Sequence, residues 1–342
     1  MMRLSGLNAN DWRKHERQSR VCLVMINEIK QVTCVGSGLV GQGWAALFAL
    51  NGYKVVLQDL TDEKLSESVQ RVNHHIDVLV GAGLGSDPEA AKKRLSKTTN
   101  MREALKDTDF VIESVYEKLE VKCPLYAEMD EIAPKHVILA SSTSGYMMSE
   151  INRDMKKHPE RAIVAHPWNP VHLVPLVELS PSPVTSKETI DKTYKLMEDI
   201  GRVPVVLKKE VPGFIANRLS AVLWREALHL ADQGVASVED IDKAIKAGPG
   251  IRWAIMGPYL TYHLGGGKGG IKYIMDHIGT SKAEWLKTMA QWTEYPEAVK
   301  EKAVEGVDEM VGDMPLEELE AWRDNYLIAL NKLLWSGERK IY

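Results

Sequence analysis

The chain has 342 residues and a formal net charge of −4 at pH 7, with 44% hydrophobic and 26% charged residues. This length suits two domains of roughly 100–200 residues each, and the composition is that of a folded globular protein. The mild negative charge argues against nucleic-acid binding over the whole chain. No run approaches the ~20 apolar residues that span a bilayer, so we expect no membrane segment.

Three cysteines and the first residues of the chain bear on its compartment. Cys22, Cys34 and Cys123 form no CxxC pair, which argues against a disulfide framework and against a zinc site. Residues 1–24 lack the apolar core of a signal peptide, so we interpret them as an N-terminal extension. Together these features favour a reduced, cytoplasmic setting without a bound metal.

From residue 25 onward, short β-branched runs alternate with helical patterns. The predicted strands span residues 32–35, 55–57, 110–112, 137–140, 162–164, 176–179 and 203–207. Alternation of this kind predicts an α/β fold, with a doubly wound parallel sheet covered by helices on both faces.

The pattern changes near Pro212. Apolar residues at helical spacing follow from Ile215 to Leu230, and residues 237–247 and 315–334 also predict helices. The helices could instead complete one large fold, but the clean change of period favours two domains. We therefore expect an α/β domain over residues 25–208 and a smaller all-helical domain over residues 209–342.

A glycine-rich turn follows the first predicted strand. It consists of Gly36, Ser37, Gly38, Leu39, Val40 and Gly41. A buried helix follows, and the next strand ends at Asp59, about 20 residues on, where an acidic side chain can accept hydrogen bonds from ribose hydroxyls. Glycines at these positions permit a tight turn and a close approach of the backbone to a pyrophosphate at the helix N-terminus. The pattern therefore indicates a Rossmann-type dinucleotide site, the alternative being a structural turn in another α/β fold.

The acidic residue also bears on the choice of dinucleotide. No Arg directly follows Asp59 to offset the repulsion of a 2′-phosphate. We therefore expect NAD rather than NADP as the cofactor.

A histidine and a glutamate form the second informative pattern. His166 follows the strand at 162–164, and Glu178 lies in the strand at 176–179, twelve residues later. The carboxylate could orient the imidazole by accepting from one ring nitrogen, which leaves the other nitrogen to accept a hydroxyl proton during oxidation by NAD. Spacing alone also allows a structural histidine and an ordinary surface glutamate.

Two further polar features accompany this pair. The run Ser141–Ser144 places hydroxyls at the carboxyl end of a predicted strand, where ligands bind in open α/β sheets. A helix N-cap is the alternative for these residues. Asn217 is an amide on an otherwise apolar helix, where it could equally serve as a cap or as an inter-helix hydrogen bond.

At this point several motifs in one order resemble the 3-hydroxyacyl-CoA dehydrogenase family over residues 31–230. They are the glycine turn, residues 112–117 with Lys122, residues 141–144, residues 166–170 with Glu178, and residues 212–218. The resemblance implies a catalytic dyad in which His166 is the base and Glu178 orients it. It also implies polarisation of the substrate oxygen by Ser144 and Asn217. The positions implied around the nicotinamide and its ribose are Glu117, Lys122 and Asn169, and a homodimer is implied through the helical domain.

Two regions differ from the CoA enzymes of that family. A Lys-rich helical hairpin that helps to hold CoA in those enzymes is shorter here, over residues 70–100. Residues 248–258 and 322–324 are more similar to a branch of the family that oxidises small free 3-hydroxy acids, L-carnitine or L-gulonate. We therefore expect a small hydroxy acid as substrate. A CoA thioester and a non-catalytic structural role, as in a lens crystallin of this branch, are the alternatives.

The aromatic residues bear on which acid is bound. Residues 224–228 and 252–254 are closer to the carnitine enzymes, and proteins bind quaternary ammonium groups in cages of aromatic rings. Arg252 is the candidate for the substrate carboxylate. The candidate rings are Tyr146, Trp168, Trp253, Tyr259 and Tyr262. Core or interface packing is the alternative for each ring, and a sugar acid would use amide and hydroxyl partners instead.

Overall fold

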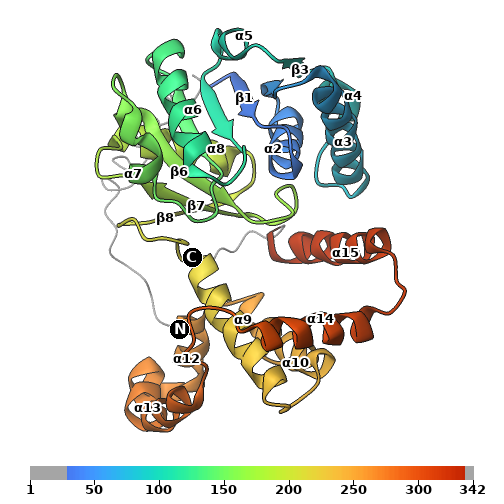
Figure 1. The fold of residues 1–342 in the computed structure, drawn as a ribbon, viewed down its shortest axis with the longest axis vertical. Helices are drawn as coiled ribbons and strands as arrows, with labels where there is room; N and C mark the ends of the chain where they lie inside the picture. Colours follow the sequence, from blue (N-terminus) through green and yellow to red (C-terminus); the bar gives the residue numbers. More distant parts are fainter. Residues whose placement is uncertain (1–28, 336–342) are drawn as a thin grey trace, which may run out of the picture. The chain divides into compact units, whose positions relative to one another are not determined.

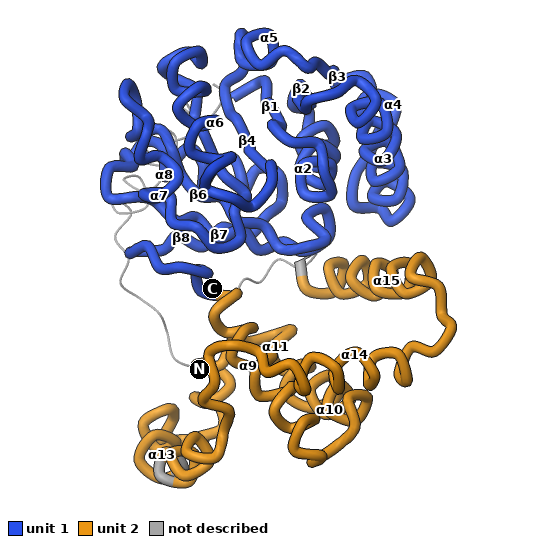
Figure 2. Tube along the Cα trace, viewed as in Figure 1, with its two compact units in different colours: residues 1–215 blue, residues 216–342 orange. Residues whose placement is uncertain are grey.

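The computed structural model describes residues 29–335, so the extension expected at residues 1–24 lies outside the described part. The described chain forms two compact units, one ending at Ile215 and the other beginning at Ala216 (Figure 2). Residues 209–215 therefore lie in the first unit, whereas the sequence pattern assigns them to the helical domain. The physical reason is Phe214, which is fully buried in a core cluster of the first unit.

The first unit is built on an eight-stranded sheet with the order β3-β2-β1-β4-β5-β6-β7-β8. The strands are β1 Gln31–Val35, β2 Lys54–Gln58, β3 Leu95–Thr98, β4 Phe110–Glu113, β5 Ile138–Ser141, β6 Ala162–Pro167, β7 Leu176–Pro181 and β8 Val203–Val206. Seven of them are predicted from the sequence. The eighth, β3, is not predicted, because it is an edge strand with no fully buried side chain.

All neighbouring strands run parallel except β6 and β7, which are antiparallel. A parallel connection needs about a dozen residues or more for its crossover, and only residues 168–175 separate these two strands. The expectation of a wholly parallel sheet is therefore wrong at this pair. The reversal places the end of β6 beside the start of β7.

Helices cover both faces of this sheet (Figure 1). They are α2 Leu39–Leu50, α3 Asp62–Gly81, α4 Pro88–Lys92, α5 Met101–Leu105, α6 Leu119–Ile132, α7 Met148–Ile151 and α8 Lys187–Asp199. Along β4, Phe110 and Ile112 belong to one buried apolar cluster and Val111 to the other. A strand that is apolar on both faces is typical of a doubly wound sheet, and the predicted fold class is confirmed.

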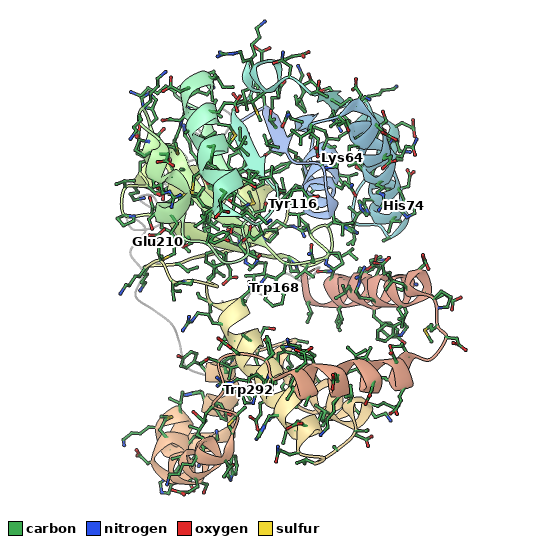
Figure 3. The ribbon with its side chains drawn as sticks, viewed as in Figure 1. Lys64, His74, Tyr116, Trp168, Glu210 and Trp292 are labelled. Atoms are coloured by element: carbon green, nitrogen blue, oxygen red, sulfur yellow. The ribbon has the colours of Figure 1, made fainter. Side chains whose placement is uncertain are left out.

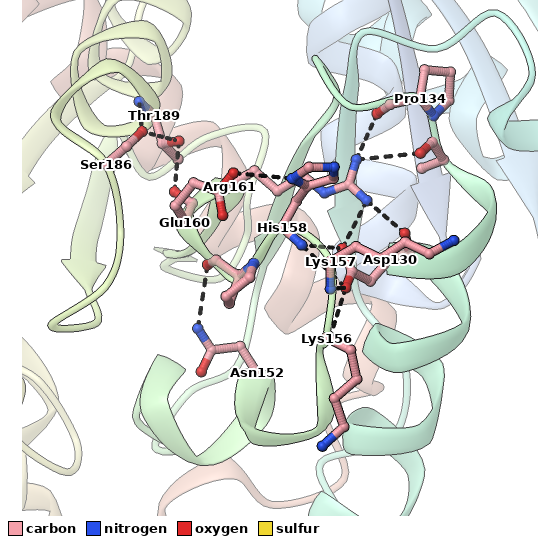
Figure 4. Close-up of polar contacts among 12 residues, drawn as sticks. Asp130, Pro134, Asn152, Lys156, Lys157, His158, Glu160, Arg161, Ser186 and Thr189 are labelled. Atoms are coloured by element: carbon pink, nitrogen blue, oxygen red, sulfur yellow. Dashed lines mark hydrogen bonds and ion pairs between the residues drawn. The ribbon is translucent and has the colours of Figure 1, made fainter.

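A buried ion pair joins α6 to the start of β6. Arg161 donates from Nη2 to Oδ1 of Asp130 at 2.9 Å, and both side chains are buried (Figure 4). Asp130 also accepts from the backbone N–H groups of residues 156–158. Burial raises the pKa of Asp130, but these backbone bonds and the Arg161 charge outweigh it, so the pKa is lowered overall. The pair anchors the strand on which His166 lies.

The second unit is helical. Its helices are α9 Ala216–Asp232, α10 Val238–Ile245, α11 Ile251–Trp253, α12 Pro258–Gly265, α13 Gly270–Thr288, α14 Glu297–Val311 and α15 Leu316–Trp335. The sequence predicts α9, α10 and α15 but leaves the stretch between α10 and α15 without assigned helices. Across both units, no helix in the described part is long and apolar enough to cross a membrane.

Candidate active site

The glycine turn joins β1 to α2. Gly36 has φ +91°, and a Cβ there would lie 2.6 Å from the carbonyl oxygen of Ser114. A Cβ on Gly41 would lie 2.0 Å from the carbonyl oxygen of Gly36, so neither position accepts a side chain. Above Gly38, by contrast, no atom lies within 4 Å of an added Cβ.

The start of α2 fits a pyrophosphate. Its N-cap residue, Gly38, makes no side-chain capping bond, and the first turn holds no acidic residue. The first N–H groups and the positive end of the helix dipole therefore face the open space over the turn. These are the features that bind phosphates at helix N-termini.

Asp59 follows β2, next to this turn. Its Oδ2 accepts from the backbone N–H and the hydroxyl of Ser37 at 2.9 and 2.8 Å. Its Oδ1 accepts from Leu60 N–H at 2.7 Å and lies 3.4 Å from Lys64 Nζ. Burial raises the pKa of Asp59, but these bonds outweigh it and the pKa is lowered overall. The group is therefore an anion at neutral pH, as a partner for ribose hydroxyls must be.

A second buried ionic network lies at the ends of β4 and β5. Lys122 Nζ lies 2.7 Å from Oε1 of Glu113 and 3.2 Å from Oε2 of Glu117. Lys122 and Glu113 are almost fully buried, while the Glu117 side chain is 40% exposed. Oε2 of Glu113 accepts from the Ser141 hydroxyl at 2.7 Å.

Glu117 connects this network to the hydroxyl run. Its Oε1 accepts from the Thr143 hydroxyl and, at 2.9 Å, from the backbone N–H of Ser144. Burial raises the pKa of Glu117, but the bond from Thr143 and the charge of Lys122 outweigh it, so the pKa is lowered overall. Ser144 itself is exposed. Three of the predicted residues, Glu117, Lys122 and Ser144, therefore lie in one constellation.

His166 and Glu178 face each other across β6 and β7, where they are register partners. His166 Nδ1 lies 3.0 Å from Oε2 of Glu178, and both side chains are buried. When Glu178 is ionised, Nδ1 is the donor and Nε2 carries the lone pair. No described residue makes a hydrogen bond to Nε2, so this nitrogen can receive a proton from a ligand.

A turn at residues 212–215 fixes this pair and approaches the hydroxyl run. The Phe214 ring packs on the His166 ring with centroids 5.1 Å apart. The backbone N–H of Ile215 donates to Oε1 of Glu178 at 2.8 Å. Gly213 N–H donates to Gly145 O at 3.2 Å, directly after Ser144. Gly213 and Phe214 both have positive φ, 73° and 53°, and this left-handed turn brings the three contacts together.

The loop between β6 and β7 carries two more predicted residues, Trp168 and Asn169. Trp168 is half-buried and its Nε1–H has no hydrogen-bond partner in the described structure (Figure 3). Asn169 is exposed. The loop packs closely on α2, because a Cβ on Gly43 would lie 2.7 Å from the Val171 Cβ. Tyr146, after the hydroxyl run, is half-buried and packs against a core cluster.

The remaining candidates belong to the second unit. Asn217 lies on α9 and is half-buried, whereas Arg252 and Trp253 are exposed on α11. Tyr262 has a cation of the protein on its ring, because Lys282 Nζ lies 3.5 Å from the ring centroid. One face of this ring is therefore in contact with a cation of the protein.

Sequence reasoning missed three contributors to the site. Glu113 is the buried partner of Lys122, and its signal was a charged residue at the end of an apolar strand. The backbone N–H of Ile215 donates to Glu178, and a backbone group cannot be predicted from the type of the residue that carries it. Lys64 lies five residues after Asp59, so it is not part of a pattern in which a cation directly follows the acidic residue.

The comparisons with known proteins identify the family of this chain. Residues 31–211 match the family model of the 3-hydroxyacyl-CoA dehydrogenase NAD-binding domain, and residues 213–306 match that of the C-terminal domain of the same enzyme. L-carnitine dehydrogenase of Oceanobacillus iheyensis is 38% identical over 90% of this chain and 98% of its own length. The enzyme of the same name from Bacillus cereus is 40% identical over 91% and 95%.

A solved structure is also similar. It is that of 5-formyl-3-hydroxy-2-methylpyridine 4-carboxylic acid 5-dehydrogenase, described as an NAD+-dependent dismutase. The TM-score is 0.74 at 26% identity, covering 91% of this chain and all of that one. The two family models together span most of the chain, as does each of the two relatives, and the glycine turn with Asp59 fits NAD. The chain belongs to the 3-hydroxyacyl-CoA dehydrogenase family of NAD-dependent oxidoreductases.

Proposed function

We propose that this protein oxidises the 3-hydroxyl of a small free 3-hydroxy acid, and that the acid is L-carnitine. The observation that carries the reaction is the contact between His166 and Glu178, which leaves Nε2 of a buried imidazole for a proton. The choice of acid is supported by relatives named L-carnitine dehydrogenase at 38–40% identity over most of the chain.

In the proposed mechanism, His166 Nε2 accepts the proton of the substrate hydroxyl. Glu178 keeps the ring oriented and stabilises the imidazolium that forms. When bound, NAD would accept the hydride from the carbon that carries this hydroxyl. The O–H and C–H bonds break and a C=O bond forms. One proton and two electrons would leave together as the hydride, and His166 holds the other proton.

Other residues are proposed to bind and orient the reactants. The Ser144 hydroxyl and the Asn217 amide donate to the substrate oxygen. Glu117, Lys122 and Asn169 surround the nicotinamide and its ribose. Support for Ser144 comes from its place beside Glu117, which accepts from its backbone N–H.

Carnitine would need partners for a trimethylammonium group and a carboxylate. We propose that Tyr146, Trp168 and Trp253 supply rings for the cation and that Arg252 pairs with the carboxylate. Trp253 is 45% exposed and its ring is therefore accessible. Arg252 is exposed as well.

We also propose that the protein is a homodimer through its helical unit. Along α9, Leu219, Val222 and Leu223 form an apolar stripe at helical spacing, yet all three side chains are exposed. Obligate homodimer interfaces resemble a domain core cut in half, and such a stripe fits one. A second copy of the chain is the occupant we propose for this stripe.

The test is NADH formation by the full-length protein with four substrates in parallel: L-carnitine, L-gulonate, 3-hydroxybutyrate and 3-hydroxybutyryl-CoA. We expect L-carnitine to give the highest kcat/KM. Turnover of the CoA ester alone would overturn the free-acid proposal. Preference for L-gulonate would retain the free acid but remove the aromatic cage.

Arg252→Lys and Trp253→Leu refine this test. Both changes should raise the KM for carnitine by about tenfold or more while NAD affinity stays the same. Glu239→Gln, on the exposed surface of the same unit, is the matched control. If Arg252→Lys and the control behave alike, Arg252 does not hold the carboxylate.

A further inference from the structure

A lysine lies beside the acidic residue of the dinucleotide site. The α3 helix begins after Thr61, whose hydroxyl accepts from Lys64 N–H at 3.4 Å. Lys64 is therefore on the first turn of the helix, and its side chain reaches Asp59, the residue that follows β2. Its Nζ lies 3.4 Å from Oδ1 of Asp59, with 53% of the Lys64 side chain exposed and 9% of that of Asp59.

The Asp59 carboxylate has no acceptor position left. An ionised carboxylate offers about four lone-pair positions. Ser37 donates two hydrogen bonds, from N–H and hydroxyl, Leu60 N–H donates the third, and Lys64 donates the fourth. A ribose that binds here must replace at least one of these donors. The Lys64 contact is the longest and its side chain is half-exposed and flexible, so it is the donor that yields most readily.

We propose that Lys64 sets the cofactor selectivity of this site by admitting the 2′-phosphate of NADP as a second ligand. With an unpaired Asp59, a 2′-phosphate would meet an uncompensated negative charge. Lys64 neutralises that charge, and its ammonium can turn from Asp59 to the phosphate and form a charge-assisted hydrogen bond with it. NAD remains preferred because Asp59 still accepts from a free 2′-hydroxyl.

The other charges near this turn do not replace Lys64. Lys97 on β3 donates to the Ser66 hydroxyl at 2.7 Å and lies 3.5 Å from Asp62 Oδ1, so it is held away from Asp59. Asp62 and Glu63 on the first turn of α3 are exposed and add negative charge. Among the described residues, Lys64 is thus the cation that contacts Asp59. Lys97 is a matched lysine on the neighbouring strand β3.

The experiment measures binding rather than turnover, so it does not depend on the hydroxy acid. The dissociation constants of 5′-AMP and adenosine 2′,5′-bisphosphate are measured by titration calorimetry on the full-length protein. These probes differ only in the 2′-phosphate. We expect measurable binding of both probes to the unaltered protein, with 5′-AMP bound more tightly.

Replacing the lysine should change the ratio of the two constants. In Lys64→Met, the discrimination against the 2′-phosphate should rise about tenfold, whereas Lys97→Met should leave it unchanged. Lys64→Arg keeps the charge and should keep the ratio within about threefold. An unchanged melting temperature for each variant shows that the fold persists.

Three results would overturn the proposal. One is a ratio in Lys64→Met equal to that of the unaltered protein. Another is an equal loss of affinity for both probes, which would mean that Lys64 only shapes the turn. The third is a change in Lys97→Met as large as in Lys64→Met, which would mean that overall charge and not the Asp59 contact sets the ratio.

Discussion

The two units treat their apolar side chains in opposite ways. The first unit buries its large apolar residues in two clusters, one on each face of the sheet. Among side chains described in the second unit, the buried apolar residues are Leu228, Ile274, Ala290 and Val299. Many aromatic and aliphatic side chains of that unit are exposed instead, Trp285 at 61% and Tyr326 at 61% among them.

Apolar composition alone therefore does not reveal which part of a chain buries its own core. The apolar residues of α9 follow the helical period as regularly as those of α3. In α3, Leu65, Val72 and Ile76 pack into a core cluster, whereas the stripe of α9 stays exposed. A periodic apolar face on a helix predicts that another surface packs against it. In the first unit that surface belongs to the same unit.

The largest expected effect tests whether the chemistry depends on the first unit. His166→Gln should lower kcat by about 10²–10⁴-fold, because general base catalysis contributes that much. Steady-state NADH formation measures the loss, and NAD binding should be unchanged. Glu178→Gln should lower kcat by a smaller factor, because the imidazole of His166 remains. A near-normal rate in His166→Gln would remove the proposed base.

The next effect tests the closed core of the first unit. Asp130→Asn leaves buried Arg161 without its charge partner and should lower the free energy of unfolding by about 3–5 kcal/mol at pH 7. Because the pKa of Asp130 is lowered in the folded state, its stabilisation is complete above the ordinary Asp pKa of about 3.9. It is lost as pH falls through the lowered value.

Denaturant unfolding between pH 7 and pH 3 measures both the loss of stability in Asp130→Asn and its dependence on pH. The difference in the free energy of unfolding between Asp130→Asn and the unaltered protein should become smaller as the pH is lowered. A difference that widens on acidification would contradict the direction of the pKa shift.

A smaller effect tests the open face of the second unit. Val222→Asp places a charge in the exposed stripe of α9 and should weaken self-association by more than about tenfold, without lowering the stability of the first unit. Sedimentation over a concentration series measures it. Lys243→Ala, an exposed lysine on α10, is the control. Equal association of the two variants would place the interface elsewhere.

The smallest effect comes from a surface pair of the first unit. Lys187 and Asp191 are ion-paired one turn apart on α8, and both are exposed. Lys187→Ala should change the free energy of unfolding by no more than about 0.5 kcal/mol. Compared with Asp130→Asn in the same unfolding assay, it separates burial from charge as the source of stability.

Local sequence patterns predict most strands of the sheet and most residues of the candidate site. The remaining features depend on contacts between residues that are distant in the sequence. The glycine turn and Asp59 can be predicted from the sequence because their function depends on residue type at a local spacing. The edge strand β3 cannot, since Leu-Ser-Lys-Thr has no distinctive apolar pattern. The Gly-rich stretch at 265–270 hides the pattern of the two helices that it joins, α12 and α13.

The site shows the same division. The pairing of His166 with Glu178 was suggested by spacing, but its direct register depends on the reversal of β7. The bond from Ile215 N–H to Glu178 and the approach of Lys64 to Asp59 depend on how distant turns fold back. Such contacts involve backbone atoms or long flexible side chains, and single-sequence patterns carry no signal for them.

The left-handed turn at residues 213–214 has a consequence for protein engineering. A chain cut after Lys208, at the end of the predicted α/β domain, would lose Phe214 from the core and Ile215 N–H from Glu178. The dissected domain would therefore have a cavity beside the imidazole and a carboxylate with one bond fewer. Grafting this domain onto another partner requires the splice point to lie after Ile215.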